Sequence, residues 1–171
     1  VKGIEVLIDA VLALDNPNIT LTVLGDDRSE YAVELKEKVK SLSQGSRILF
    51  LGKHTDVRPF LAQSDLYVIP TLNEGRKEGM PMALVEAMSM GVPVLGSAIS
   101  GIQYVLKDFP LLLFEASNSK QLAEKIESLY SKSEEERATI GEELRAYTVQ
   151  HFSMDRFITA HENLYSYLVK K

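Results

Sequence analysis

Short apolar runs alternate with helical patterns over the first 116 residues of this 171-residue chain, and this alternation restricts the fold more than any other feature. Five runs rich in β-branched or aliphatic residues are predicted to be strands, at residues 19–25, 47–52, 65–70, 92–96 and 111–114. Helical patterns lie at residues 4–14, 29–42, 56–63, 81–90 and 102–106. Strands that are apolar on both faces and separated by helices indicate parallel βαβ units. We therefore expect an α/β fold with a Rossmann-like, doubly wound parallel sheet.

The strand pattern ends near residue 117, and three further helices are predicted at residues 120–130, 134–151 and 155–169. Ser133 and Glu136 have the spacing of a capping box at the start of the second of these helices. The last helix has one apolar face, formed by Met154, Phe157, Ile158, Leu164, Tyr165 and Leu168. We expect one domain over residues 1–171, with a Rossmann-like core at about 1–116 and a C-terminal helical segment at about 118–171. Because Val1-Lys2-Gly3 leads at once into a helical pattern, we also expect a fragment of a longer protein.

The composition excludes several classes of function. Apolar residues make up 45% and charged residues 25% of the chain, as in ordinary soluble globular proteins. The net charge of −5 argues against a nucleic-acid-binding face. The absence of cysteine excludes disulfides, thiolate chemistry and cysteine-based zinc sites, and the three histidines lack metal-ligand spacing. With no visible signal peptide or membrane span, we expect a cytoplasmic protein without a metal site.

The segment EGMPMALVEAMSMGVPVLG, residues 78–96, is the strongest candidate for a site. Glu86 is the only charged side chain between residues 79 and 106, and it lies in a helical pattern that is apolar on nearly every face. We predict a buried helix, in which an unpaired carboxylate would cost several kcal/mol. Glu86 should therefore meet either a core Arg or Lys or a ligand. Gly79-Met80-Pro81 is typical of a helix entrance, whose free N–H groups favour an anion such as phosphate, and Glu78 lies just outside it.

The same segment resembles the E-x7-E region of the retaining family 4, or group 1, glycosyltransferases of the GT-B fold. The resemblance extends to KG at residues 2–3, to LTVLGDD at 21–27, to RILFLGKHTDVRPFLAQSDLYVIPT at 47–71 and to HFSMDRF at 151–157. It implies that the chain is the C-terminal, donor-binding domain, with the N-terminal acceptor domain absent. The spacer TLNEGRKEG is similar to that of members that build bacterial surface polysaccharides.

The resemblance also implies roles for individual residues. Lys2 would neutralise the donor diphosphate, as suits a point charge beside phosphate oxygens. Glu86 would accept hydrogen bonds from the ribose hydroxyls. Glu78 would be the catalytic residue, in contact with the transferred sugar near its anomeric carbon.

Further donor contacts follow from the same resemblance. The backbone N–H groups around Gly79, Met80 and Met82 would face the sugar and the diphosphate, and Lys53 and His54 would flank the base. No Asp-x-Asp motif is present, so no metal and no cofactor other than the nucleotide-sugar substrate is expected. Two features depart from the family pattern. An acidic residue, Asp27, replaces the second turn glycine and would crowd the phosphate side, and the family's arginine and first strand would precede Val1.

The resulting hypothesis is a domain of an enzyme that transfers a sugar from a UDP- or GDP-sugar to a carbohydrate or lipid-linked acceptor with retention of configuration. We expect the fragment alone to be inactive and the full-length enzyme to associate with the inner face of the plasma membrane. One alternative is a non-catalytic nucleotide-binding module. The other is an epimerase of the same fold, or a glycoside hydrolase, that uses Glu78 and Glu86 as an acid/base pair.

Overall fold

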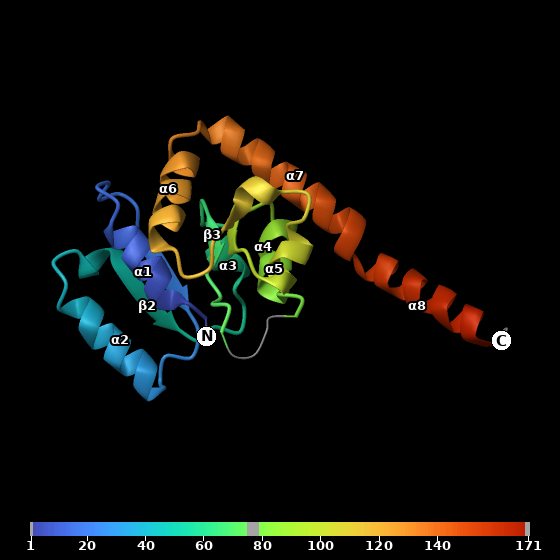
Figure 1. Cartoon of the computed structure of the whole chain (residues 1–171), viewed down its shortest axis with the longest axis horizontal. Coiled ribbons are helices and arrows are strands. Elements are labelled where there is room, and N and C mark those ends of the chain that lie inside the picture. Colours follow the sequence, from blue (N-terminus) through green and yellow to red (C-terminus); the bar gives the residue numbers. More distant parts are fainter. Residues whose placement is uncertain (1, 75–78, 170–171) are drawn as a thin grey trace.

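Parallel strands with helices packed around them form the body of the molecule (Figure 1). The structure is a computed structural model that describes residues 2–74 and 79–169. Every predicted strand is confirmed over a somewhat different length. The strands are β1 (Leu21–Leu24), β2 (Ile48–Gly52), β3 (Tyr67–Ile69), β4 (Val94–Ser97) and β5 (Leu113–Phe114).

The predicted helices are confirmed as well; the first four are shorter than the sequence pattern indicated, and the last four are each one residue longer. They are α1 (Ile4–Leu12), α2 (Glu30–Lys40), α3 (Arg58–Leu61), α4 (Met82–Ser89), α5 (Ser100–Val105), α6 (Ser119–Tyr130), α7 (Glu134–Phe152) and α8 (Met154–Val169). Short 3₁₀ turns, Gly45–Arg47 and Pro110–Leu112, precede β2 and β5. The predicted capping box is present, because Ser133 and Glu136 bond each other's backbone N–H groups at the start of α7.

Hydrogen bonding divides the strands into two parallel sheets instead of one continuous sheet. β1 pairs with β2, and a second sheet has the order β3-β4-β5. In the common doubly wound order, a central strand lies between the strands that correspond to β1 and β3. Residues 2–74 and 79–169 supply no strand at that place. The α/β class and the parallel direction of the strands are as predicted.

Helix α1 holds the two sheets together because it contributes to both apolar cores. Its Leu7 and Val11 belong to the large core around β3, β4 and α4, whereas Ile8 packs with α2 and β2 in a smaller core. The start of α1 is fixed by Gly3, which has φ 66° and approaches β3 so closely that an added Cβ would lie 1.8 Å from the Pro70 carbonyl oxygen. Residue 2 is therefore anchored next to the chain segment that leaves β3.

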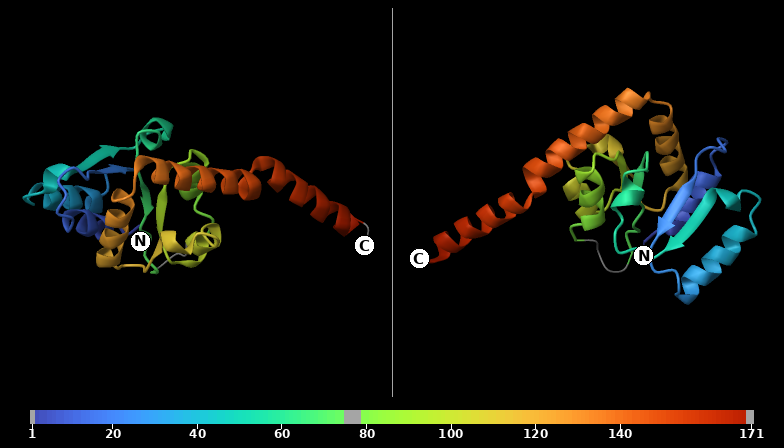
Figure 2. Two further views of the ribbon diagram at one scale, coloured as in Figure 1. Left: turned by 90° about the horizontal axis from the view of Figure 1, so that it is seen from above. Right: turned by 180° about the vertical axis from the view of Figure 1, so that it is seen from behind.

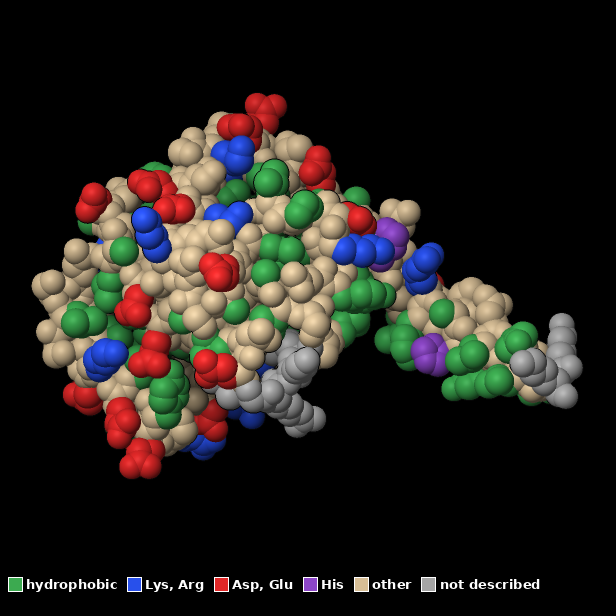
Figure 3. Space-filling model, viewed as in Figure 1, with side chains coloured by type: hydrophobic (Ala, Val, Ile, Leu, Met, Phe, Trp, Pro, Cys, Tyr) green, Lys and Arg blue, Asp and Glu red, His purple; other side chains and the backbone are tan. Residues whose placement is uncertain are grey.

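The C-terminal helices differ in how they contact the body. Helix α7 packs on α4 through Leu144, which is fully buried. Helix α8 projects away from the body in every view (Figure 2) and has no buried residue. Its predicted apolar face is present but exposed to solvent, and Figure 3 shows these apolar side chains along the projecting helix. None of the helices among the described residues is long and apolar enough to cross a membrane.

Candidate functional site

Helix α4 carries Glu86 on its solvent side, so the prediction of a helix buried all round is wrong. Leu84 and Met88 face the core and are fully buried, whereas Met82, Glu86 and Ser89 are exposed. The exposed face carries Met, Ala and Ser besides Glu86, and such residues do not distinguish a solvent face from a core face in the sequence. Within the described part of the chain, the Glu86 carboxylate has no ion-pair or hydrogen-bond partner, and its oxygens are available to a ligand.

The N-terminus of α4 is open to the solvent. Pro81 is the N-cap instead of the first helical residue, and its carbonyl accepts a hydrogen bond from the Leu84 N–H at 3.0 Å. The side chains of Met80 and Met82 are about half exposed, and a Cβ added to Gly79 would meet no atom within 4 Å. The first N–H groups of a helix have no partner within it. This end of α4 can therefore accept an anion without rearrangement of the core.

A cavity of about 400 Å³ lies beside Glu86, between α4 and the loop that follows β2. Its lining residues are Thr55, Asp56, Val57, Arg58, Leu61, Glu86, Ser89 and Met90. The cavity combines two carboxylates, two hydroxyls and one guanidinium with the apolar side chains of Val57, Leu61 and Met90. Sequence reasoning did not identify residues 55–58. Their position in the sequence could have indicated them, because they follow the predicted strand at 47–52 and belong to the loop that begins with Lys53 and His54.

Asp56 and Arg58 form a bidentate ion pair on the wall of this cavity. Arg58 donates from Nε and Nη2 to the two Asp56 carboxylate oxygens at 2.8 Å each, and its backbone N–H donates to Asp56 Oδ1 at 3.0 Å. These hydrogen bonds stabilise the charged carboxylate and lower the pKa of Asp56 to about 2. The pair is therefore formed at neutral pH, and its guanidinium plane has a defined orientation.

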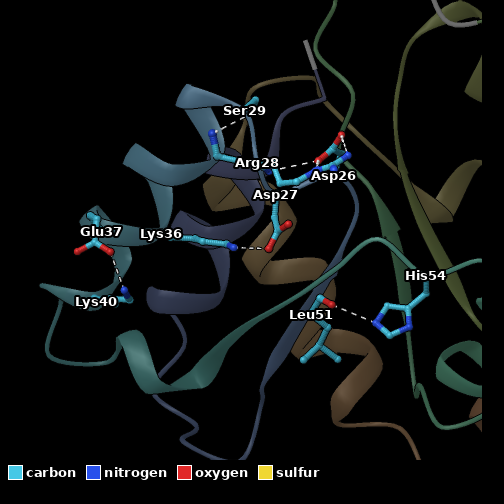
Figure 4. A network of polar contacts seen from close by, with 10 residues as sticks. Asp26, Asp27, Arg28, Ser29, Lys36, Glu37, Lys40, Leu51 and His54 are labelled. Carbon is cyan, nitrogen blue, oxygen red and sulfur yellow. Dashed lines mark hydrogen bonds and ion pairs between the residues drawn. The ribbon is translucent and has the colours of Figure 1, made fainter.

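Lys53 and His54 lie at the carboxyl end of β2, next to the cavity but not on its lining. The His54 Nε2 atom is 3.0 Å from the Leu51 carbonyl oxygen (Figure 4). The His54 ring packs edge-on against Phe60, with 4.5 Å between the ring centroids. The structure brings the loop that contains both residues next to Glu86. The His54 side chain itself contacts Leu51 and Phe60, which are close to it in sequence.

Asp27 forms an ion pair with Lys36 of α2, as Figure 4 shows. The hydrogen bond from Lys36 is the main cause of the lowered pKa of Asp27. The Asp27 carboxylate also lies 3.5 Å from the position of a Cβ on Gly52. It therefore packs over the end of β2, with its charge balanced by Lys36.

Lys2 is exposed. It precedes Gly3, which packs against Pro70 directly after β3, in the segment that leads from β3 to α4. This position is consistent with a role at the N-terminus of α4. Glu78, the predicted catalytic residue, lies outside the described residues.

A second, polar cavity of about 450 Å³ lies at the carboxyl ends of β4 and β5. Its lining residues are Asn73, Glu74, Ala98, Leu113, Phe114, Glu115, Ala116, Ser117 and Gln121. Ser117 has φ 67°, a conformation that non-glycine residues rarely adopt. Two of the residues described on this wall are carboxylates and none is a cation, so the cavity suits hydroxyl groups better than phosphate. Among the described residues, no group of three His, Asp or Glu side chains could hold a metal ion.

The parallel α/β fold is that of open α/β proteins, in which ligands bind at the carboxyl ends of the strands. The chain belongs to the glycosyl transferases group 1 family, whose model matches residues 1–146. The resemblance found in the E-x7-E region is thereby confirmed at the level of the family.

Three similar proteins place the chain further. N-acetyl-alpha-D-glucosaminyl L-malate synthase of Bacillus anthracis is 30% identical over 166 residues, which cover 96% of this chain and 42% of that protein. Lipopolysaccharide core biosynthesis mannosyltransferase LpsB of Rhizobium meliloti is 33% identical over 103 residues, or 57% of this chain and 28% of that protein. The crystal structure of Anabaena HepE in complex with UDP superposes with a TM-score of 0.83 and 26% identity, covering 99% of this chain and 46% of that one. The chain thus spans less than half the length of each of these three proteins.

Proposed function

We propose that this chain is the donor-binding domain of a glycosyltransferase that uses a UDP- or GDP-sugar. The observation that carries the proposal is the Glu86 carboxylate, which has no partner among the described residues and lines a cavity beside α4, the helix whose N-terminus is open to the solvent. A nucleotide diphosphate presents vicinal ribose hydroxyls, which donate to a carboxylate, and phosphate oxygens, which accept from N–H groups. The complex of the similar protein HepE with UDP supports a uracil nucleotide as the first candidate.

In this arrangement, the diphosphate would lie at the N-terminus of α4, where the N–H groups around Gly79, Met80 and Met82 and the ammonium of Lys2 would contact it. Negative charge develops on the diphosphate as the bond to the sugar breaks. Donors that are already oriented towards this charge stabilise the transition state without having to reorganise. Glu86 would hold the ribose, and the loop that begins with Lys53 and His54 would lie on the base side.

The remaining features of the enzyme belong to the same proposal. The sugar would be transferred with retention to a carbohydrate or lipid-linked acceptor, with Glu78 at the reacting carbon and the acceptor held by a second, N-terminal domain. The name of the Rhizobium relative supports a role in bacterial surface polysaccharide synthesis. Association of the full-length enzyme with the inner face of the plasma membrane belongs to the same proposal. The Bacillus relative is named for a different product, N-acetyl-alpha-D-glucosaminyl L-malate.

A titration of the isotope-labelled domain with UDP, GDP and ADP, followed by NMR, tests nucleotide binding. We expect one nucleotide to shift the amide signals of Lys2, Gly79, Met82 and Glu86. Replacement of Glu86 by Gln removes charge-assisted hydrogen bonds and should weaken binding at least tenfold. Glu143→Gln, an exposed glutamate on α7, is the matched control and should bind like the wild type. If no nucleotide shifts these signals, the proposal is wrong.

The alternatives differ in what the full-length protein produces. A transferase requires Glu78, so Glu78→Ala should abolish transfer, whereas a non-catalytic module would bind nucleotide with no turnover at all. A hydrolase would release free sugar, and an epimerase would convert one nucleotide-sugar into another without an acceptor. Chromatography of the products from wild-type and Glu78→Ala protein separates these outcomes.

A further inference from the structure

We infer that the polar cavity at the carboxyl ends of β4 and β5 binds a neutral sugar unit of the acceptor. The polar cavity shares no lining residue with the cavity beside Glu86, so the inference gives a ligand to a separate part of the domain. Sugar binding follows from the polar cavity itself, whereas the assignment of that sugar to the acceptor rests on the proposed function.

The polar cavity has the size and the position of a ligand site. Its volume of about 450 Å³ lies within the range of small-molecule sites. Ala98 and Glu115 directly follow β4 and β5, while Asn73 and Glu74 belong to the segment that leads from β3 to α4. Ligands of open α/β proteins bind in the crevice at the carboxyl ends of the strands. The polar cavity therefore lies at the edge of the sheet where a substrate is expected.

Three polar side chains on the wall of the polar cavity have no partner in the described part of the chain. Asn73, Glu74 and Ser117 form no side-chain hydrogen bond or ion pair with residues 2–74 or 79–169. Asn73 offers both an amide donor and an acceptor, Glu74 offers a carboxylate, and Ser117 offers a hydroxyl. A sugar hydroxyl both donates and accepts, so neighbouring hydroxyls need a wall that supplies donors and acceptors together.

The other polar groups of this wall hold one another in place. The backbone N–H of Glu115 donates to Gln121 Oε1, and Asn118 Nδ2 donates to Glu115 Oε2 at 3.0 Å. Asn118 also caps α6, because its Oδ1 accepts from the Gln121 N–H at 2.9 Å. Side chains that are already ordered lose little conformational entropy when a ligand binds. The wall beside Ser117 is therefore preorganised.

The charge of the polar cavity favours a neutral ligand. Glu74 and Glu115 are carboxylates, and none of the described lining residues is a cation. A phosphate would be repelled by these two charges, whereas the hydroxyls of a neutral sugar can donate charge-assisted hydrogen bonds to them. The partly buried side chains of Ala98, Leu113 and Ala116 offer apolar surface to the C–H groups of the sugar ring.

The same charge argues for a sugar that is not attached to a nucleotide. In the proposed function the donor sugar is bonded to the diphosphate, which lies at the N-terminus of α4 with Lys2. A diphosphate held close to Glu74 and Glu115 would be unfavourable, and a neutral sugar unit of the acceptor avoids this cost. The two substrates would then occupy separate cavities, and the acceptor would be held by this domain as well as by the N-terminal one.

An NMR titration of the isotope-labelled chain tests sugar binding without a nucleotide. The probes are the methyl α-glycosides of glucose, mannose, galactose and N-acetylglucosamine, each at millimolar concentration. We expect at least one of them to shift the amide signals of Asn73, Ser117 and Gln121 and to leave that of Glu86 unchanged.

A variant and its control test the role of the unpartnered carboxylate. Glu74→Gln removes a charge-assisted acceptor and should bind the same glycoside about tenfold more weakly. Glu124→Gln, an exposed glutamate of α6 that does not line the polar cavity, is the matched control and should bind like the wild type. Both residues are exposed, so both variants should keep the wild-type fold, and circular dichroism checks this.

A comparison of UDP with UDP-glucose identifies the source of the sugar. We expect both to leave the signals of Asn73, Ser117 and Gln121 unchanged. If UDP-glucose shifted these signals while UDP and the glycosides did not, the polar cavity would hold the donor sugar and the inference would be wrong. It would also be wrong if no glycoside shifted them, or if Glu74→Gln bound the glycoside as tightly as the wild type. Glycoside binding by a wild type that binds none of UDP, GDP and ADP would instead overturn the proposed function and the assignment to the acceptor, while the sugar site would stand.

Discussion

Replacement of Gly141 by Ala tests the contact that fixes the site helix to the C-terminal part of the domain. A Cβ added to Gly141 of α7 would lie 1.9 Å from the carbonyl oxygen of Gly91 and 2.9 Å from its carbonyl carbon. Both neighbours are backbone atoms, so no side-chain rotation can relieve the overlap. Gly91 follows Met90, the C-cap of α4, and has φ 74°, and this backbone conformation limits its own movement. Helix α7 would have to move away from α4 by more than about 1 Å.

Such a movement would loosen the contact around Leu144 and Met88, which are both fully buried. Overpacking of this kind costs about 1–3 kcal/mol or more, while Gly→Ala in a helix contributes about 1 kcal/mol of stabilisation. We expect a net loss of about 2 kcal/mol in the free energy of unfolding, or a Tm lower by about 4–8 °C.

Urea denaturation followed by circular dichroism measures this change, with an unaltered m-value as the sign of an intact fold. Thr139→Ala, on the exposed side of the same helix, introduces the same residue without a clash and should cause no loss. A Gly141→Ala protein that is as stable as the wild type, or more stable by about 1 kcal/mol, would show that helix propensity dominates and that the close contact between α7 and α4 does not exist.

Three further predictions concern stability. Arg47 is buried and donates to two backbone carbonyls and one side-chain amide, so Arg47→Met should lose about 3 kcal/mol in urea denaturation; an unchanged midpoint would contradict this. The pKa values of Asp26 and Asp56 are lowered to about 2 in the folded protein, so the unfolded chain binds more protons and stability should fall as the pH drops from about 5 to 2. Thermal unfolding of the D26N/D56N double variant should show a weaker acid dependence than the wild type, and equal slopes would refute the assignment. Ser133→Ala removes the N-cap of α7 and should cost about 1 kcal/mol, whereas a thermal midpoint equal to that of the wild type would argue against the capping box.

The sequence was sufficient for the elements and their order because each has a local physical cause. The strands are short apolar runs ended by Gly, Pro or Asp, and the start of α7 is marked by the Ser133–Glu136 capping box. The division into two sheets could not be predicted in this way, because strand pairing depends on contacts between distant segments. The positions of β1 and β3 relative to each other are set by α1, through residues that contribute to both cores.

The site was predicted only in part. The sequence identified Glu86 because a single charge in a long uncharged stretch needs a reason, but it misplaced that charge in the core. The sequence did not reveal that Asp56 and Arg58 line the cavity, because an Asp-x-Arg pair in a loop gives no information about its tertiary contacts. Asp26 and Arg28 form a pair with the same local geometry but line neither cavity, so local sequence alone could not have distinguished the two pairs.

The exposure of Glu86 changes the argument about what this residue does. A buried carboxylate needs a partner for the stability of the fold, and a ligand would be one of several solutions. An exposed carboxylate without a partner in the described residues needs none, so its removal should leave the free energy of unfolding unchanged within about 0.5 kcal/mol. The Glu86→Gln variant should therefore lose nucleotide affinity while keeping the urea midpoint of the wild type. If the variant lost both stability and nucleotide affinity, the role of Glu86 would instead be to stabilise α4.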